Sequence, residues 1–418
     1  MARIVLATTG SFGDLHPMIA LAIELRKRGH SCLIASWEGY RKKVNDLGFE
    51  FHALRPDADP TDRELIRKTM DAVNGTEVVI KEIIFPSLRE MYDDLLSACD
   101  GADVIITGEL VYAVASVVEK TGIKWISTSL APISMFSFED PSLYPGFHWM
   151  EILRPMPAFL NRALFSLVRM TISDWYEPYK RFRQDLGLST DHDPIFDDKF
   201  SKLLHLTMFS KALGRPQSDW PTSTLQTGFC FYDESESGSL DVELSQFLDA
   251  GEPPIVFTLG TAAVLDAGDF FDESAKAAKL FGRRAVLLYG RDNETPKGLD
   301  ENIAAFPYAP YSQVFPKAAC VVHQAGVGTT AQVLRAGVPH LIMPYSHDQP
   351  DNAARCRRAG VAEIISRDDY NAASSAKALE QILSNRKYRE SAAQLKRIVN
   401  SENGTVTACD AIELILRK

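Results

Sequence analysis

The sequence predicts an α/β protein with two doubly wound parallel sheets, each at the centre of its own domain. Short apolar runs alternate with helical patterns in both halves of the chain. The chain has 418 residues, which is too long for one typical core. An acidic, Ser/Gly-rich stretch separates the two halves. We therefore expect an N-terminal domain over 1–232, a linker over 233–240, a C-terminal domain over 241–402 and a last helix within 403–418.

The N-terminal half contains apolar runs of the kind that form strands buried on both faces. The segment from Pro17 to Arg28 has apolar residues at helical spacing, and Gly29 would end that helix. The predicted strands are Arg3–Thr8, Ser31–Ser36, Val104–Thr107, Trp125–Ser129 and Leu204–Met208, and the predicted helices are Pro17–Arg28 and Tyr40–Leu47.

The pattern changes between about residues 134 and 186, where aromatic residues, prolines and methionines cluster. We interpret this stretch as a loop-plus-helix insertion on the first domain. It forms either a satellite hydrophobic cluster or the wall of a pocket for an apolar molecule. The candidate wall residues are Phe136, Phe138, Phe147, Trp149 and Met150.

In the C-terminal half the alternation restarts, with strands predicted at Ile255–Leu259, Ala285–Tyr289, Ala319–Val322 and Leu341–Met343 and helices at Phe270–Phe281 and Thr330–Ala336. One strand turns through glycines into a helix. Such a turn makes an anion site, because free backbone N–H groups and the positive end of the helix dipole face the ligand. The residues of this turn are Gly326, Gly328, Thr329 and Thr330.

A second loop, Pro344–Asn352, follows the next strand. Its Asp348, Gln349 and Asn352 suit a neutral polyol better than a phosphate. Asp351 and Asn352 also fit helix caps and surface positions. One loop for a diphosphate and one for hydroxyls is the pattern of a nucleotide-sugar site.

The stretches His323–Thr330 and Pro344–Asn352 together resemble the donor-binding signature of the family 1 glycosyltransferases. Within that family the chain is similar to the bacterial branch with sterol glucosyltransferases, rhamnosyltransferases and antibiotic glycosyltransferases. The resemblance implies the GT-B fold, in which two Rossmann-like domains face each other across a cleft. It also implies that the last helix, Ala408–Leu416, packs back on the first domain.

The resemblance implies a role for each matching donor residue. His323 would contact the diphosphate, or alternatively close its strand with the ring against the sheet. Asp348 with Gln349 would bind sugar hydroxyls. Bacterial relatives often carry a second histidine and then a glycine where this chain has Gln324 and Ala325. The remaining donor candidates are Gly13, Gly260 and Thr261 in phosphate loops, Gly326, Gly328, Thr329 and Thr330 in the helix turn, Tyr308 near the base and Gln332 near the ribose.

The first strand ends in a glycine turn, Thr8–Pro17, at the sheet edge where ligands bind in α/β proteins. By resemblance, Asp14 is the base that removes the proton of the acceptor hydroxyl. Near a helix N-terminus its pKa should be low. Alternatively Asp14 is a helix N-cap. His16 is a rival base, and Glu109 matches loosely a second carboxylate that orients the base in plant relatives.

Composition excludes several other classes. The net charge of −10 argues against nucleic acid, although Arg355, Arg357 and Arg358 could form a local patch. The strings Asp57-Ala58-Asp59 and Asp191-His192-Asp193 lie in loops and indicate surface turns, and no Cys/His cluster has metal spacing. We expect neither metal nor cofactor. Six scattered cysteines, no spanning segment and no signal peptide predict a cytoplasmic protein.

The sequence thus predicts an inverting hexosyltransferase that uses a UDP- or dTDP-sugar such as UDP-glucose. The acceptor would be a hydroxyl of an apolar small molecule or lipid. Two alternatives stay open: a nucleotide-sugar epimerase of the same fold, and a catalytically silent protein that only binds nucleotide. The sequence does not indicate the oligomeric state.

Overall fold

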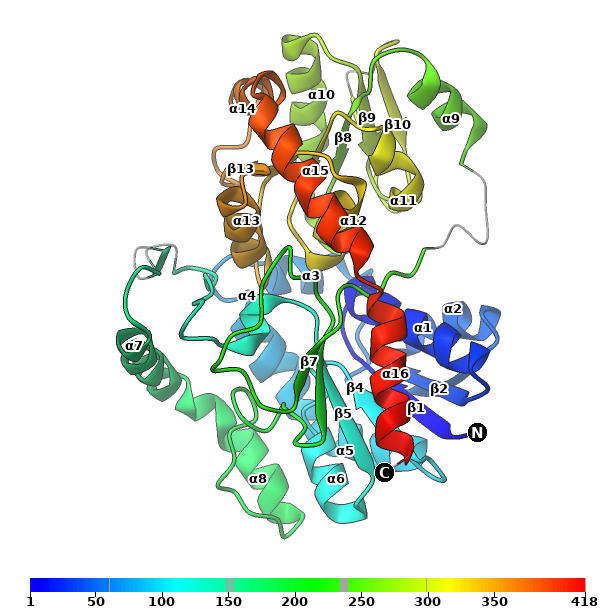
Figure 1. Cartoon of the computed structure of the whole chain (residues 1–418), viewed down its shortest axis with the longest axis vertical. Helices are drawn as coiled ribbons and strands as arrows, with labels where there is room; N and C mark the ends of the chain where they lie inside the picture. The colour runs from blue at the N-terminus through cyan, green and yellow to red at the C-terminus, as the bar shows by residue number, and fades with distance from the viewer. Residues whose placement is uncertain (60, 148–149, 152–153, 234–239, 298, 418) are drawn as a thin grey trace.

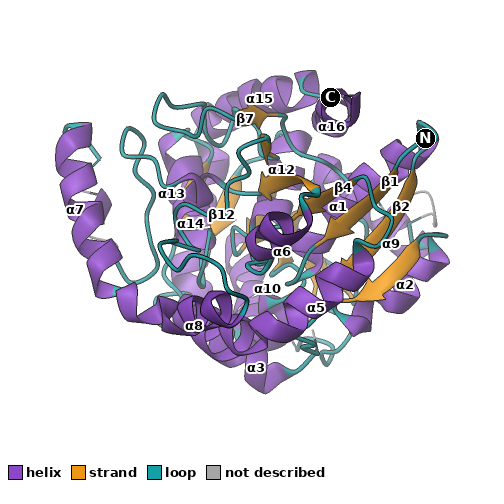
Figure 2. Cartoon of the chain, turned by 90° about the horizontal axis from the view of Figure 1, so that it is seen from below, coloured by secondary structure: helices purple, strands orange, loops and turns teal. Residues whose placement is uncertain are grey.

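Two lobes, each built around a parallel sheet, make up the molecule (Figure 1). The computed structural model describes residues 1–59, 61–147, 150–151, 154–233, 240–297 and 299–417. The N-lobe sheet has the order β3-β2-β1-β4-β5-β6-β7 and the C-lobe sheet the order β10-β9-β8-β11-β12-β13. Figure 2 shows the N-lobe from below, with its strands lying among helices.

The central strands lie within one residue of their predicted bounds. They are β1 Arg3–Ala7, β2 Ser31–Ser36, β4 Val104–Thr107, β5 Lys124–Ser129, β6 Leu204–Thr207, β8 Ile255–Thr258, β9 Ala285–Leu288, β11 Cys320–His323 and β12 His340–Ile342. The sequence prediction did not include four further strands, β3 Glu50–Ala53, β7 Thr224–Gln226, β10 Ile303–Phe306 and β13 Ala362–Ile364. All four are edge strands.

Helix α1, Phe12–Lys27, begins five residues before the predicted start at Pro17. Ser11 is its N-cap and exchanges hydrogen bonds with Asp14 in a capping box. Asp14 is therefore not the N-cap itself, as one interpretation of the sequence had it. Pro17 lies in the second turn of the helix.

Most of the other α-helices lie around the two sheets, and α7 stands apart at the side of the N-lobe (Figures 1 and 2). In the N-lobe they are α2 Arg41–Asp46, α3 Arg63–Thr69, α4 Gly75–Val78, α5 Leu88–Ala98, α6 Val114–Thr121, α7 Ala158–Thr171 and α8 Glu177–Asp185. In the C-lobe they are α9 Val242–Asp249, α10 Phe270–Phe281, α11 Tyr311–Val314, α12 Val327–Ala336, α13 Gln349–Arg358, α14 Ala372–Ser384 and α15 Arg386–Ser401.

The predicted insertion lies between β5 and β6 and contains α7 and α8. Its described residues contain no strand, in agreement with a loop-plus-helix insertion. Helix α7 stands at the side of the N-lobe in both views (Figures 1 and 2). The predicted linker falls mostly on 234–239, which lie outside the described residues.

The last helix, α16 Gly404–Arg417, leaves the C-lobe and packs against α1 of the N-lobe (Figure 1). Arg28 Nη1 donates to Asp410 Oδ1 over 2.6 Å. Buried apolar residues of α16, such as Ile412, belong to the same core as Leu21 and Leu25 of α1. The chain therefore passes from one lobe to the other twice.

All six cysteines are unpaired, and Cys99 alone among them is not fully buried. In the part of the chain that the structure describes, no helix is both long and apolar enough to cross a membrane.

Candidate active site

The turn between β1 and α1 holds the carboxyl group of Asp14 at the carboxyl edge of the N-lobe sheet. The backbone N–H of Ser11 donates to Asp14 Oδ2 over 2.8 Å, and Ser11 Oγ donates to the same oxygen over 3.2 Å. Gly10 has φ +118°, and a Cβ there would lie 2.5 Å from Asp14 Oδ2. A glycine is therefore required for the carboxyl group to fold back over the turn.

Burial raises the pKa of Asp14 to about 6, and the negative charge of Glu109 adds to this effect. The hydrogen bonds from Ser11 oppose it but are outweighed. The low pKa expected from the helix N-terminus is therefore wrong, because loss of water around the carboxylate is the larger effect. A pKa near 6 leaves Asp14 ionised at neutral pH and a better base than an exposed aspartate.

The two other candidate catalytic residues occupy different surroundings. Glu109, just beyond β4, accepts a hydrogen bond from the backbone N–H of Leu130 over 2.9 Å, and its Oε2 lies 3.8 Å from Lys199 Nζ. Glu109 thus acts on Asp14 through its charge, whereas its hydrogen bond is with the backbone of Leu130. The ring of His16 lies between Phe12 and Tyr232, with centroid distances of 5.3 and 5.1 Å.

The N-terminus of α12 faces the Asp14 turn from the C-lobe. Val327, its first residue, packs against the N-lobe core and donates its backbone N–H to Asp348 Oδ2 over 3.1 Å. Asn352 Nδ2 donates to the same oxygen over 2.7 Å. Burial raises the pKa of Asp348 to about 7, and the charge of Asp14 raises it further. The two carboxyl groups therefore belong to one electrostatic site.

His323 is placed differently from the expectation drawn from the resemblance. Its ring is fully buried at the end of β11, where Nδ1 accepts a hydrogen bond from Ala325 N over 3.1 Å. Its Nε2 therefore carries the proton and faces His340 Nδ1 over 3.0 Å. Burial lowers the pKa of His323 well below its usual value. In this structure His323 is a neutral core residue and does not present an N–H to a diphosphate.

Gln324 instead occupies the place where the two predicted phosphate loops meet. Its side chain is 5% exposed, and its Oε1 is buried without a hydrogen-bond partner. A Cβ on Gly260 would lie 2.4 Å from Gln324 Nε2, and one on Gly326 would lie 2.9 Å from it. The glycines thus leave room for this amide. Gln324 is the better candidate for a neutral contact with the diphosphate.

Backbone strain gathers around this site. Three described non-glycine residues have left-handed φ angles, namely Phe136 at +49°, Ala325 at +71° and His347 at +57°. Ala325 precedes the N-cap of α12, and His347 precedes Asp348. A left-handed φ such as that of Ala325 is a conformation that glycine adopts more easily than alanine. Strain of this kind persists where the surroundings fix the backbone, as at ligand sites.

The remaining donor candidates are spread along the same edge. Gly13 lies in the first turn of α1 and Gly328 in that of α12, and a Cβ on Gly328 would meet no atom within 4 Å. Thr261 is exposed, whereas Thr329 and Thr330 are buried, and Thr330 Oγ1 has no partner.

Three further candidates engage neighbouring groups. Gln349 Oε1 accepts from Tyr345 N over 2.9 Å. Gln332 Nε2 donates to Asp233 over 3.1 Å, which places it at the start of the linker. Tyr308 keeps 41% of its surface exposed beside Arg291.

Two sequence interpretations of α13 are wrong. Asp351 and Asn352 are fully buried and are not surface residues. Arg355 is also buried and forms ion pairs with Asp351 and Asp140, while Arg357 pairs with Glu151. Carboxylates therefore neutralise two of the three arginines of the possible basic patch, Arg355 and Arg357. Asp140 and Glu151 belong to the insertion, so these pairs join the insertion to the C-lobe.

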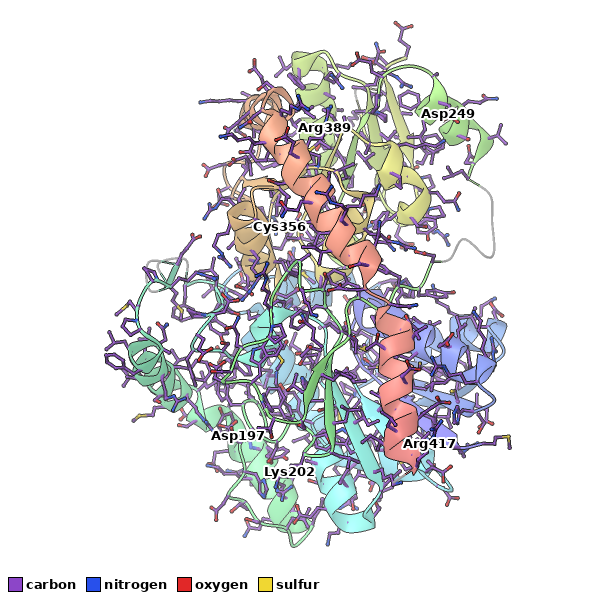
Figure 3. The ribbon with its side chains drawn as sticks, in the orientation of Figure 1. Asp197, Lys202, Asp249, Cys356, Arg389 and Arg417 are labelled. Carbon is purple, nitrogen blue, oxygen red and sulfur yellow. The ribbon has the colours of Figure 1, made fainter. Side chains whose placement is uncertain are left out.

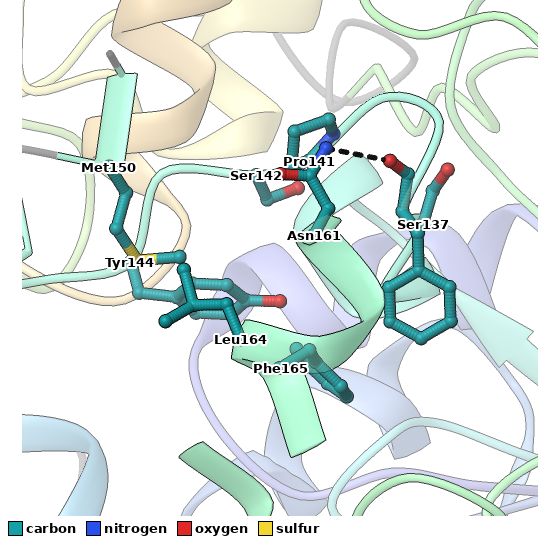
Figure 4. Close-up of a pocket in the computed structure, with 9 residues that line it drawn as sticks. Ser137, Pro141, Ser142, Tyr144, Met150, Asn161, Leu164 and Phe165 are labelled. Atoms are coloured by element: carbon teal, nitrogen blue, oxygen red, sulfur yellow. Dashed lines mark hydrogen bonds between the residues drawn. The ribbon is translucent and has the colours of Figure 1, made fainter. Parts of the chain in front are cut away.

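The insertion lines a small cavity of about 20 Å³ beside α7, which has room for about one water molecule (Figure 4). Two of the predicted wall residues, Phe138 and Met150, line it. Phe136 packs against Phe165 of the same wall at a centroid distance of 5.6 Å. Phe147 is 44% exposed and does not line this cavity. Trp149 lies outside the described residues.

No group of three or more His, Cys, Asp or Glu residues in the described part of the chain is placed to hold a metal ion. The strings at 57–59 and 191–193 lie in loops. Asp193 caps a turn, with hydrogen bonds from Ile195 N and Phe196 N of 3.0 Å each.

Comparison with known proteins gives matches over both lobes. Residues 4–132 match the glycosyltransferase family 28 N-terminal domain, and residues 275–407 match the erythromycin biosynthesis protein CIII-like C-terminal domain. The chain is 31% identical over 432 residues to an O-mycaminosyltylonolide 6-deoxyallosyltransferase of Streptomyces fradiae, covering 98% of this chain and 97% of the relative. It is 26% identical to a sterol 3-beta-glucosyltransferase of Leptosphaeria maculans, covering 98% of this chain and 28% of the relative.

Solved structures share the fold. The glycotransferase of kitacinnamycin superposes with a TM-score of 0.71 at 21% identity over 99% of both chains. A spinosyn rhamnosyltransferase complexed with thymidine diphosphate gives 0.69 at 16% identity, over 98% of this chain and 100% of that one. With the full-length relative and both family matches, these findings lead to one conclusion: the chain belongs to the family 1 glycosyltransferases, nucleotide-sugar-dependent enzymes of the GT-B fold.

Proposed function

We propose that this glycosyltransferase moves a sugar from a UDP- or dTDP-sugar to a hydroxyl of an apolar small molecule, with inversion and with Asp14 as the base. The observation that carries the proposal is the setting of the Asp14 carboxyl group. Ser11 holds it at the end of β1, burial raises its pKa to about 6, and it is close enough to Asp348 for their charges to interact.

Inversion requires one group that takes the proton of the acceptor as its oxygen attacks the anomeric carbon. Both bonds from Ser11 reach Oδ2 of Asp14. In the described residues, Oδ1 accepts no hydrogen bond from another residue, so it is the oxygen available for the proton. A single base is sufficient because the diphosphate leaves as an anion.

The leaving diphosphate would be stabilised by α12 and by neutral donors, in a reaction that needs no metal. Val327 N, the first backbone N–H of α12, donates to Asp348 Oδ2. A phosphate at this helix N-terminus would compete with that carboxylate for the amide. Asp348 would then turn to the sugar hydroxyls, with Gln324 as a further contact to the diphosphate.

The insertion and the relatives support an apolar acceptor. Aromatic side chains of the insertion such as Phe138 and Phe165 would contact the apolar body of that molecule. The relatives are named for a macrolide-type tylonolide and for sterols. We therefore propose a polycyclic or macrocyclic alcohol as acceptor and the cytoplasm as the place of action.

The test is release of nucleoside diphosphate from UDP-glucose and dTDP-sugars, with and without phenols, sterols and hydroxylated macrolactones. Asp14→Asn should lower acceptor-dependent release by about 10²- to 10⁴-fold, the usual contribution of a general base, while donor binding persists. His16→Ala should lose far less. The product of an α-linked donor should be β-linked by NMR. A larger loss in His16→Ala, or retention at the anomeric carbon, would overturn the assignment.

A further inference from the structure

Lys199 is a buried lysine whose amine lacks a close hydrogen-bond partner in the N-lobe. Its side chain is 8% exposed, and among the described residues it forms one long ion pair, with Glu109 Oε2 3.8 Å from Nζ. Nζ donates no hydrogen bond to any residue that the structure describes. The ammonium instead lies over aromatic rings, 4.4 Å from the centroid of Phe136 and 5.1 Å from that of Phe200. A buried ammonium with unmet N–H donors is costly unless a ligand supplies an oxygen.

Lys199 lines a second, smaller cavity of about 10 Å³ that lies next to the Asp14 turn. Glu109 lines it together with Gly108 at the end of β4. Gly108 packs so closely on Thr8, at the end of β1, that a Cβ on the glycine would lie 2.6 Å from Thr8 Oγ1. The cavity has room for about one water-sized group, such as a single carbonyl or carboxylate oxygen, and none for a ring system. Its other walls include Thr107, Tyr112, Trp125 and Asp198.

Phe136 stands between this polar cavity and the aromatic cavity of the insertion. One side of its ring meets Lys199. The ring also contacts Tyr144 at 6.4 Å and Phe165 at 5.6 Å, and both of these residues line the aromatic cavity. Phe196 also packs edge-on against the ring at a centroid distance of 4.7 Å. A molecule with an apolar body and an oxygen-bearing substituent would contact the walls of both cavities at once.

We propose that Lys199 binds a carbonyl or carboxylate oxygen of the acceptor in the cavity beside Asp14. The acceptor is then an oxygenated macrocycle or polycycle, because a sterol with a single hydroxyl group has no second oxygen for Lys199. This inference rests on the proposed function, since it assumes that Asp14 receives the acceptor hydroxyl. An ammonium pointing at a carbonyl is a charge-assisted donor and helps to orient the acceptor.

The test uses matched acceptors that differ in one oxygen function. The probes are 3β-hydroxysteroids and hydroxylated macrolactones, each with a distal ketone, with a distal carboxylate and with neither. Lys199→Met should raise the KM for the oxygenated members by about 10- to 100-fold, the usual worth of a hydrogen bond to a charged group. It should leave the KM of the members without that oxygen unchanged. Comparison of ketone with carboxylate identifies the oxygen.

The matched control is Lys202→Met, because Lys202 is an exposed lysine three residues away (Figure 3). Lys199→Arg keeps the charge, so it should retain part of the difference in KM between acceptors with and without the distal oxygen. Melting temperatures report whether each variant folds. If Lys199→Met raises KM equally for acceptors with and without the distal oxygen, or raises it for neither, the inference is overturned.

A binding measurement separates this inference from the proposed function. Trp125 lies in the cavity wall, so acceptor binding should quench tryptophan fluorescence without turnover. If oxygenated acceptors bind and Lys199→Met weakens them, but no nucleoside diphosphate is released, then the proposed transfer fails while the Lys199 site stands. If transfer proceeds and binding does not distinguish the pairs, the Lys199 site is wrong.

Discussion

The carboxyl groups of Asp14 and Asp348 show how single residues set the chemistry of this site. Both are removed from water and lie near another negative charge, so both hold protons more tightly than exposed aspartates. Their raised pKa values mean that ionising them opposes folding. Their net effect on stability is therefore most favourable below the unfolded pKa and is lost as the pH rises through about 6 to 7.

The first prediction concerns the pH dependence of activity. If Asp14 is the base, kcat/KM should rise with pH through a midpoint near 6, because the carboxylate is the active form. Glu109→Gln removes a charge that raises this pKa, so the midpoint should move to lower pH. The measurement is kcat/KM from pH 4.5 to 8.5. If the midpoint does not move in Glu109→Gln, a group other than Asp14 controls the rise of kcat/KM with pH.

Residue environments were the hardest part to predict from the sequence. Lys199 lies in the charged string Asp197-Asp198-Lys199, which is typical of a solvated turn, yet its side chain is buried. The local sequence likewise predicts that Arg355 is an exposed cation on the surface of α13. In both cases the burying groups come from segments far away in the chain, such as Phe136 and Asp140. The local sequence contains no signal for them.

Elements are joined across the lobes by the ion-pair cluster at Arg355. Its guanidinium donates to Asp351 on its own helix and to Asp140 and Ser142 of the insertion. Leu143 N also donates to Asp351 Oδ1 over 3.0 Å. Helix α13 begins with Gln349, directly after Asp348, so the insertion that lines the aromatic cavity is fastened to the helix that carries donor residues.

The second prediction tests this cluster. Arg355→Met should lower the free energy of unfolding by about 3 to 5 kcal/mol, because the fully buried Asp351 loses its ion-pair partner, whereas Asp140 keeps Arg154. Arg357→Met is the matched control. Its side chain is 43% exposed, so its ion pair with Glu151 should be worth at most about 1 kcal/mol. Urea unfolding measures both. Equal losses would mean that the Arg355 cluster contributes no more than a surface pair.

At the level of elements, the sequence predicted the inner strands and missed the outer ones for a physical reason. Inner strands such as β1 and β8 are buried on both faces and appear as continuous apolar runs. The edge strands β3, β7, β10 and β13 are short and partly exposed, so their residues alternate or are polar. Their position is set by pairing with a neighbour, which is a tertiary effect.

The whole molecule is held together by contacts of α3 and its following loop, in addition to the two chain crossings. Arg63 donates to Leu265 O over 3.0 Å, and Ile66 is buried in the C-lobe core. Ser346, beside the donor residues, donates to Asp71 O over 2.7 Å. Opening of the lobes for donor entry must break these contacts, so this loop is the part expected to move.

The third prediction concerns α16, the helix that returns from the C-lobe to the N-lobe. Ile412 of α16 is fully buried in the N-lobe core, whereas Leu414 is 59% exposed. Ile412→Ala should destabilise the N-lobe by about 2 to 5 kcal/mol, and Leu414→Ala should change stability by less than about 0.5 kcal/mol. Hydrogen exchange of β1 and β2 amides is the measurement. Faster exchange confined to the C-lobe would contradict this placement of α16.

The return of α16 to α1 also affects the order in which the chain can be built. A ribosome delivers the N-lobe first, yet Ala408, Cys409 and Ile412, which complete its core, are synthesised after the C-lobe. Apolar residues of α1 therefore stay uncovered while the C-lobe is synthesised. We expect chaperones to bind and protect the nascent chain during that interval.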